Sequence, residues 1–314
     1  MAKLTPSEAI NHLRPLAQGG KLILFAGSGV SVASDLPTWD GFLKELINFC
    51  RDVQTHLPDD KKFSDLLNDA EKRIQKDPTR VSSVLKDRLK ELELPDGGLS
   101  NVSDLFKQHF QRIFYSAKPN ANHRHIVKTN YPYILTTNYD MLIEDSAKEL
   151  GFLDLWKNSY SFNKPGRVAA AIYEERPSIL HLHGNVLDIA LTNALDEFVF
   201  TAEDYIRIKK KYSGFTLAVQ TLFFKYSVLF LAYGGSDPHL EDFLEELSYY
   251  LDWPRYPEFP LRYFLVLLKD KADLVLEKYK DKLRTEVIAV DDFNQMTELL
   301  KTLEEISPRG RVAV

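Results

Sequence analysis

Short apolar runs alternate along the chain with longer segments in which apolar residues recur at helical spacing. Apolar runs that end in turn residues are typical of strands covered on both faces of a parallel sheet. Strands that alternate with helices predict an α/β fold with a doubly wound parallel sheet. The expected strands cover Leu22–Phe25, Pro132–Leu135, Ser178–Leu182, Glu197–Thr201, Val228–Ala232, Tyr263–Leu268 and Glu286–Val290.

The expected helices also carry capping signals. Thr5 or Ser7 can cap the first helix, and Thr38 stands in the N-cap position before Trp39. These helices cover Pro6–Ala17, Trp39–Val53, Met141–Leu150, Ala202–Lys211, Phe215–Lys225, Pro238–Leu251, Ala272–Tyr279 and a last segment that ends near Ile306.

Residues 54–128 differ from the rest because they show amphipathic helical patterns without a strand signal. The patterns lie near Lys61–Ile74, Val81–Leu92 and Ser103–Tyr115. We therefore expect an inserted, all-helical module over 54–128, with 1–53 and 129–314 forming the sheet domain. Its basic cluster is expected to be a solvated face rather than a binding site; the cluster consists of Arg80, Lys86, Arg88 and Lys90.

Composition narrows the class of protein. The 314 residues are 44% apolar and 27% charged, as in globular proteins, and the formal charge of −5 does not favour nucleic acid or an anionic membrane. A single cysteine, Cys50, excludes an intramolecular disulfide and a cysteine-based zinc site, and its helical surroundings predict a core position. The first residues lack a signal-peptide pattern and the apolar runs are too short to span a bilayer, so a cytoplasmic protein is expected.

The first expected strand ends in the small residues of AGSGVS. Gly27 and Gly29 permit a tight turn with positive φ and a close approach of a ligand, and a helix after the turn would favour a phosphate. Val32 replaces the third glycine of the dinucleotide fingerprint. A strand–helix turn without a ligand explains this stretch equally well.

Three further strand ends carry polar residues, and carboxyl ends of parallel strands are where ligands bind. Asn138 and Asp140 belong either to a ligand cleft or to an Asx turn before a helix. The segment His181-Leu182-His183-Gly184 (HLHG) holds two histidines, and one of them could be a satisfied core residue, as a lone histidine usually is. His183 is the better candidate for proton transfer because it stands at the strand end and Gly184 opens space beside it. Gly234–Asp237 is either a plain turn or a source of N–H groups for a phosphate or ribose, with Asp237 in a ribose-binding or capping role.

Two common enzyme motifs are missing. The chain has no G-x-x-x-x-G-K-[ST] loop, which disfavours a P-loop NTPase. Val30 and Pro238 replace the last glycine of G-x-S-x-G after Ser28 and Ser236, which disfavours a nucleophile-elbow hydrolase.

Taken in order, five short motifs resemble those of the sirtuin family. They are GSGVS at Gly27–Ser31, DLPTW at Asp35–Trp39, TTNYD at Thr136–Asp140, HG at His183-Gly184 and GGS at Gly234–Ser236. The resemblance implies a Rossmann-like, NAD-binding sheet domain with an inserted helical module.

The departures from the sirtuin pattern point to one branch of the family. Sirtuin deacylases usually hold a zinc with four cysteines after the HG pair, which this chain lacks, and Trp39 stands where their loop has Phe. The NYD variant and Phe198–Tyr205 look more like bacterial sirtuin-like domains of anti-phage defence. Those domains cleave NAD, and they act as oligomers or with a partner such as a HerA-type ATPase or a short Argonaute.

The resemblance also implies roles for individual residues. Asn138 would position the ribose hydroxyls or the attacking water, and His183 would be the general base. Asp140 would hold the nicotinamide amide and the glycine turn the pyrophosphate. The expected NAD contacts are Ala26, Gly27, Ser28, Gly29, Val30, Ser31, Pro37, Trp39, Thr137, Asp140, Gly234, Ser236 and Asp237.

The function expected from these features is hydrolysis of NAD to nicotinamide and ADP-ribose, as an NAD-depleting effector, with NAD as substrate and no zinc or other metal. A homo-oligomer is expected, with no direct contact to nucleic acid or membrane. Two alternatives stay open, namely an NAD-dependent protein deacylase and a non-catalytic module that senses NAD or ADP-ribose.

Overall fold

The computed structural model describes residues 3–57, 60–92, 101–189, 195, 198–233, 249, 263–279 and 285–310. Among these residues, eight strands form one parallel sheet in the order β1-β8-β7-β6-β2-β3-β5-β4. The strands are β1 (Lys3–Leu4), β2 (Leu22–Ala26), β3 (Tyr133–Thr136), β4 (Ser159–Ser161), β5 (Ser178–His181), β6 (Ser227–Leu231), β7 (Tyr263–Leu268) and β8 (Thr285–Val290). The predicted doubly wound, Rossmann-like parallel sheet is confirmed.

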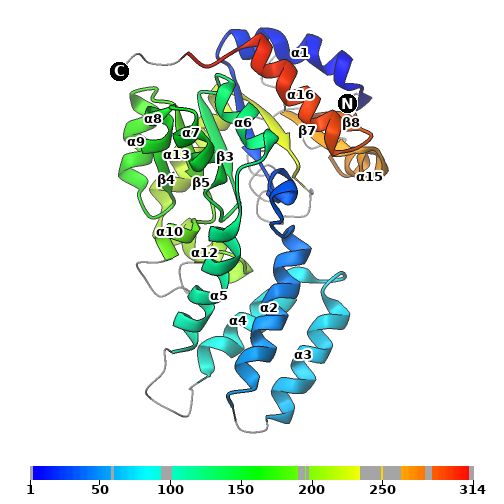
Figure 1. Cartoon of the computed structure of the whole chain (residues 1–314), viewed down its shortest axis with the longest axis vertical. Coiled ribbons are helices and arrows are strands. Elements are labelled where there is room, and N and C mark those ends of the chain that lie inside the picture. Colours follow the sequence, from blue (N-terminus) through cyan, green and yellow to red (C-terminus); the bar gives the residue numbers. More distant parts are fainter. Residues whose placement is uncertain are drawn as a thin grey trace.

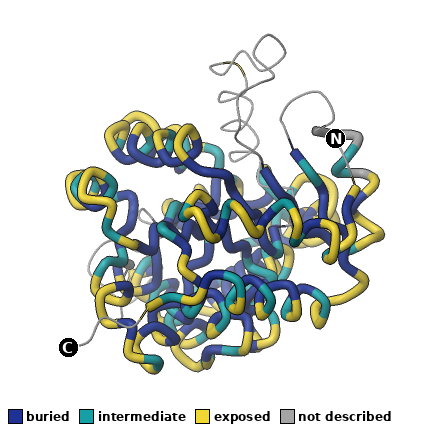
Figure 2. The backbone as a smooth tube through the Cα atoms, turned by 90° about the horizontal axis from the view of Figure 1, so that it is seen from above, coloured by how far each residue is buried: buried dark blue, intermediate teal, exposed yellow. Residues whose placement is uncertain are grey.

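The central strand β2 is buried along its whole length because helices cover both faces of the sheet. Ile23 and Phe25 face the layer formed by α9 (Pro165–Tyr173), α12 (Ala202–Lys211), α13 (Ser213–Lys225) and α15 (Lys269–Tyr279). Leu22 and Leu24 face the opposite layer, formed by α1 (Pro6–Gln18), α6 (Ala121–Lys128), α7 (Leu142–Glu149), α8 (Leu153–Lys157) and α16 (Phe293–Ile306). Figure 2 shows the result, with buried backbone inside and exposed backbone outside.

A helical region extends away from the sheet (Figure 1) and has its own hydrophobic core. It contains α2 (Trp39–Gln54), α3 (Lys61–Arg73), α4 (Pro78–Glu91) and α5 (Val102–Ser116). The buried Cys50 is part of this core, as predicted. Phe198 and Phe200, from the segment before α12, complete it. The division at residues 54 and 128 stays a proposal. It would assign α2 to the sheet domain and α6 to the helical module, but in the structure α2 packs on α3 and α4, and α6 packs on the sheet layer.

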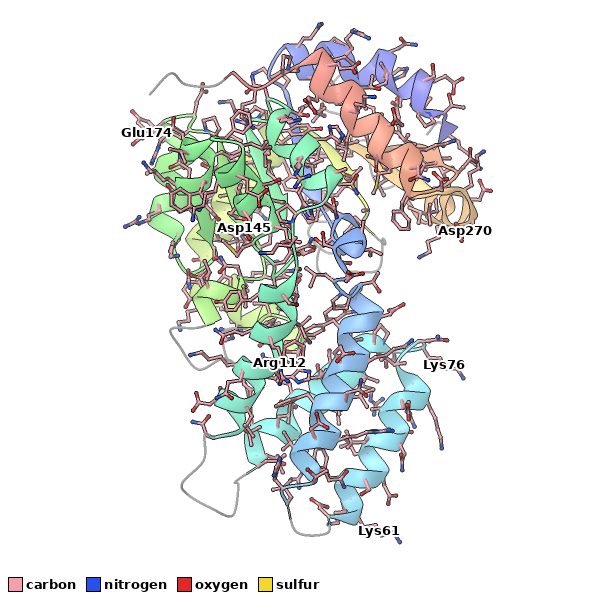
Figure 3. All side chains as sticks on the ribbon, viewed as in Figure 1. Lys61, Lys76, Arg112, Asp145, Glu174 and Asp270 are labelled. Carbon is pink, nitrogen blue, oxygen red and sulfur yellow. The ribbon has the colours of Figure 1, made fainter. Side chains whose placement is uncertain are left out.

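Charged side chains mark the outer surface of both parts. Lys61 and Lys76 lie on the helical region, and Glu174 and Asp270 lie on the sheet domain (Figure 3). Each described helix is too short or too polar to cross a bilayer.

One expected strand is wrong. Phe198–Phe200 are coil, and Tyr139 Oη donates to the Val199 carbonyl at 2.7 Å. Their apolar side chains alternate because Phe198 and Phe200 enter the helical core while Val199 enters the core of the sheet domain. The sequence prediction also missed β1, β4, α6, α8, α9 and α10 (Val186–Ile189). The helix expected over Pro238–Leu251 lies outside the described residues, apart from Tyr249.

Lys86 corrects the expectation of a solvated basic face. Its side chain is 2% exposed, and Nζ lies 2.7 Å from both carboxylate oxygens of Asp204 and from the Phe198 carbonyl oxygen. Burial lowers the pKa of Lys86 to about 8, an effect that Asp204 opposes. The pair fixes the start of α12 to α4.

Candidate functional site

The order of the strands reverses between β2 and β6. From β2 the chain continues to β3 on one side, and after β4 and β5 it returns to β6 on the other. Ligands of doubly wound sheets bind at such a reversal, beyond the carboxyl ends of the strands. A cavity of about 290 Å³ lies here, walled by the ends of these strands and by the helical region.

Most of the predicted contact residues line this one cavity. They are Gly27, Ser28, Gly29, Ser31, Pro37, Trp39, Thr137, Asn138, Asp140 and His183. The side chains of Ala26 and Val30 are instead buried in the core behind the loop. Gly234, Ser236 and Asp237 lie outside the described residues.

The glycines of the loop after β2 allow two strand ends to approach each other. Gly27 has φ −94°, and a Cβ there would lie 2.5 Å from the Ala232 carbonyl oxygen. A Cβ on Gly29 would lie 2.9 Å from the Ala232 Cβ. The expected positive φ is therefore wrong, and the close approach is that of the chain's own backbone. Two 3₁₀ turns, Ser28–Val30 and Val32–Ser34, follow the loop before α2 begins.

The side-chain amide of Asn138 is held in one orientation. Nδ2 lies 3.3 Å from the Gly27 carbonyl oxygen and 3.3 Å from Ser31 Oγ. Because a carbonyl oxygen can only accept, the amide nitrogen must face the loop. Oδ1 is buried and has no hydrogen-bond partner among the described residues. Asn138, a residue of the cavity wall, thus holds a buried acceptor in a fixed orientation that lacks a donor among the described residues.

Asp140 is buried and receives two hydrogen bonds. Ser31 Oγ donates to Oδ2 at 2.9 Å, and the Leu142 N–H donates to Oδ1 at 3.1 Å. The second bond is the predicted Asx turn before α7. Burial raises the pKa of Asp140, and the two hydrogen bonds oppose this shift. Asp140 therefore shapes the turn and also lines the cavity.

His123, on α6, contacts Ser31 from behind the loop. Its Nε2 lies 3.2 Å from Ser31 Oγ, and its Nδ1 lies 3.1 Å from the backbone nitrogen of Asn120. Burial lowers the pKa of His123 to about 4, so the ring is neutral at neutral pH.

His181 and Glu144 form a buried pair beneath Asn138. His181 Nδ1 donates to the Asn138 carbonyl oxygen at 3.0 Å, and Nε2 lies 2.7 Å from Glu144 Oε1. Burial opposes the charge on His181, but Glu144 and the hydrogen bonds outweigh it, so the pKa of His181 is raised. Both ring nitrogens face acceptors, which describes an imidazolium. His181 is thus the satisfied core histidine of the HLHG segment.

His183 follows β5 and lines the cavity. Gly184 has φ +79°, a conformation that favours glycine and turns the chain away after His183. Tyr205, on α12, places its hydroxyl against His183 Nε2, with the two rings at 88°. Burial lowers the pKa of His183 to about 3, against an opposing effect of Asp204. The ring is therefore uncharged at neutral pH, the form that a general base needs, although a pKa this low also makes it a weak base.

The two ends of the cavity differ in chemistry. Near the helical region the wall is aromatic, and Trp39 stacks on Phe42 with ring centroids 5.6 Å apart. Beyond β7 and β8 the wall is mostly aliphatic, with Lys271 as its cationic member. The aromatic end suits the flat ring of a ligand.

Sequence reasoning missed His123, Glu144 and Tyr205. Glu144 had a usable signal, since it lies one helical turn after Asp140. Tyr205 lies within the segment that resembled the defence proteins, yet no role was assigned to it. His123 had no signal, because its partner Ser31 is 92 residues away.

Comparison with known proteins places the site in context. The model of a family described as "SIR2-like domain" matches residues 132–288. The chain is 23% identical over 313 residues to "NAD(+) hydrolase ThsA" of Cytobacillus dafuensis, a match that covers 93% of this chain and 54% of that protein. It is 24% identical over 306 residues to the ThsA of Acinetobacter baumannii (strain 532279), covering 92% and 53% respectively.

A third relative is "Defense-associated sirtuin 2" of Bacillus subtilis. It is 23% identical over 231 residues, which are 73% of this chain and 19% of that protein. The chain thus spans about half the length of the ThsA proteins that it matches, and less of the defence-associated sirtuin.

Proposed function

The chain belongs to the family of SIR2-like domains, and from this premise we propose that it hydrolyses NAD to nicotinamide and ADP-ribose. The names of its relatives support this proposal, since three ThsA proteins are called NAD(+) hydrolases. A defence-associated sirtuin among them supports a role in anti-phage defence, in which the enzyme depletes NAD.

The observation that carries the proposal is the unsatisfied oxygen of Asn138. A buried acceptor without a donor costs about 1–3 kcal/mol, and a ligand or water that supplies the donor removes this cost. Asn138 Oδ1 is such an acceptor, and its residue lines the same cavity as His183. The ribose hydroxyls of NAD and a water molecule are donors of the required kind.

The reaction breaks the bond between the nicotinamide nitrogen and the anomeric carbon. The electron pair of that bond leaves with nicotinamide, and an oxocarbenium-like state develops on the ribose, as in glycoside cleavage. Water adds its oxygen to the anomeric carbon and gives up one proton. Asn138 Oδ1 orients the water or a ribose hydroxyl, His183 accepts the proton, and Asp140 holds the nicotinamide amide.

Two substitutions test these roles. Asn138→Ala and His183→Ala are expected to fold and to lose NAD turnover by about 10²–10⁴-fold, the usual cost of a positioned acid–base group. Asn130→Ala and His56→Ala change the same residue types at exposed positions outside the cavity and should keep wild-type turnover. Chromatography of nicotinamide and circular dichroism of each variant make the comparison; wild-type rates in both site variants would overturn the assignment.

Assembly belongs to the same proposal. We propose a homo-oligomer, with a HerA-type ATPase or a short Argonaute as candidate partner. The turnover assay is therefore run on the chain alone and with each partner, with acetylated peptide in a parallel sample. Acetylated ADP-ribose formed in step with peptide loss would favour the deacylase instead.

A further inference from the structure

A chain of hydrogen bonds behind the cavity leads from Asn120, at the start of helix α6, through His123 and Ser31 to Asp140. In each bond the residue named earlier is the donor. The Asn120 N–H donates to His123 Nδ1, at 3.1 Å, so Nδ1 must present its lone pair. A neutral ring then carries its proton on Nε2. That N–H points at Ser31 Oγ, 3.2 Å away, and Ser31 in turn donates to Asp140.

Ser31 Oγ has all of its hydrogen-bonding positions filled. A hydroxyl has one donor hydrogen and two acceptor lone pairs. The lone pairs face His123 Nε2 and Asn138 Nδ2, and the hydrogen faces Asp140 Oδ2. If His123 offered a lone pair instead, the hydroxyl would have two acceptors to choose between. The tautomer of His123 thus decides which way Ser31 donates.

We propose that His123 is a positioning residue of the NAD-cleaving site. By donating to Ser31, it fixes the hydroxyl that holds the Asn138 amide and the Asp140 carboxylate. Oδ1, the unsatisfied oxygen of Asn138, is then held in a single orientation beside the cavity that its residue lines. This inference rests on the proposed function for its kinetic part, and on the geometry alone for the tautomer.

The surroundings of His123 are rigid enough for this role. The side chain is 0% exposed. Asn120, the N-cap of α6, also donates to the Val30 carbonyl oxygen at 2.9 Å and to Ser34 Oγ at 3.0 Å. The same cap therefore holds the histidine ring and the loop after β2. A misplacement of about 1 Å in such a site can cost about 100-fold in rate.

If His123 only filled space, its replacement by another side chain of similar size would have little effect. A substitution by glutamine distinguishes this role from the positioning role. Position 123 is the N3 residue of a capping box, where glutamine is a natural partner for the N-cap N–H. A glutamine side chain can accept from Asn120 with its oxygen and donate to Ser31 with its nitrogen. It thus reproduces both roles of the histidine tautomer, whereas leucine fills space and reproduces neither.

The kinetic test compares His123→Gln, His123→Leu, Ser31→Ala and the double variant Ser31→Ala/His123→Leu in the full chain. We expect His123→Leu to lower kcat by about 10- to 100-fold with little change in KM, and His123→Gln to retain most of kcat. In the Ser31→Ala background the leucine should cost little more, because its effect passes through Ser31. His125→Leu is the matched control, since His125 lies on the same helix and pairs with Glu304 away from the cavity.

The experiment distinguishes a failure of the His123 proposal from a failure of the proposed NAD hydrolysis. If glutamine and leucine are equally impaired, if leucine retains the wild-type kcat, or if the two losses multiply, the proposal is overturned. If the wild-type chain does not cleave NAD, the proposed function fails separately, and ¹⁵N NMR of histidine-labelled protein decides the inference. His123, assigned by the signal lost in His123→Gln, should show the Nε2–H tautomer at neutral pH; an Nδ1–H tautomer would overturn the proposal.

Discussion

At the scale of single residues, three buried histidines close to the cavity have different charge states. His123 and His183 are held neutral by burial, whereas His181 is held charged by Glu144. In the sequence, a following glycine sets His183 apart, but nothing there predicts the charge states of the three histidines. The difference arises from surroundings that only the fold supplies, namely burial around His123 and His183 and the Glu144 carboxylate beside His181.

The neutral histidines predict a loss of stability in acid. The pKa of His123 is about 4 in the folded chain and 6.5 in an unfolded one, so below pH 6.5 the unfolded chain binds a proton that the folded chain refuses. The free energy of unfolding should therefore fall as the pH falls from 6.5 toward 4, by up to about 1.4 kcal/mol per pH unit for this residue. His183 acts in the same direction. His181, with its raised pKa, adds stability that is complete below pH 6.5 and is lost as the pH rises above that value.

Urea unfolding of the wild type and of His123→Gln at pH 7, 6 and 5 isolates this effect. Glutamine has no titrating group, so the stability of the wild type should fall more steeply on acidification. Parallel curves for the two proteins would contradict the assignment of a neutral His123.

At the scale of elements, the loop after β2 and the end of β6 determine the shape of the cavity. Gly27→Ala would place a Cβ 2.5 Å from a backbone oxygen that belongs to the sheet. We expect a loss of about 1–3 kcal/mol in stability, as for overpacked cores, together with loss of turnover. Gly166→Ala on α9 is the control, because a Cβ there meets nothing within 4 Å, and it should be neutral or slightly stabilising. Urea unfolding that gives equal stability for the two variants would refute this account of the glycine.

The Lys86–Asp204 pair holds α12, the helix that carries Tyr205, against α4. Lys86→Met would leave the Asp204 carboxylate buried without its main cation, and such losses cost about 3–5 kcal/mol. Lys90→Met on the same helix changes an exposed lysine and should lie within about 0.5 kcal/mol of the wild type. Thermal or urea unfolding measures both, and an unchanged Lys86→Met would show that the pair does not hold α12.

The sequence predicted these elements better than their contacts. Apolar periodicity placed β7 at Tyr263–Leu268 and α12 at Ala202–Lys211 with the bounds that the structure has. It failed at Phe198–Phe200, where alternation reflects two separate cores rather than a sheet. It also failed at Lys86, because a lysine on an amphipathic helix looks solvated until its carboxylate partner, 118 residues away, is known.

At the scale of the whole molecule, the reversal of strand order brings the site together. Loops after β2, β3 and β5 supply Gly27, Asn138 and His183 to one cavity, and the helical region provides its aromatic wall. The sequence predicted these residues because they stand at strand ends. It could not predict the chain of hydrogen bonds from His123 through Ser31 to Asp140, since a hydrogen bond between distant segments leaves no local pattern.

The central claim is that this cavity breaks the bond between nicotinamide and ribose. The most direct measurement follows nicotinamide and ADP-ribose released from NAD by the wild-type chain, beside Asn138→Ala. The account predicts that both products appear in equal amounts with the wild type and that Asn138→Ala slows their release by about 10²–10⁴-fold. NAD that is bound but recovered intact, with no nicotinamide from either protein, would contradict the account and identify a sensing module.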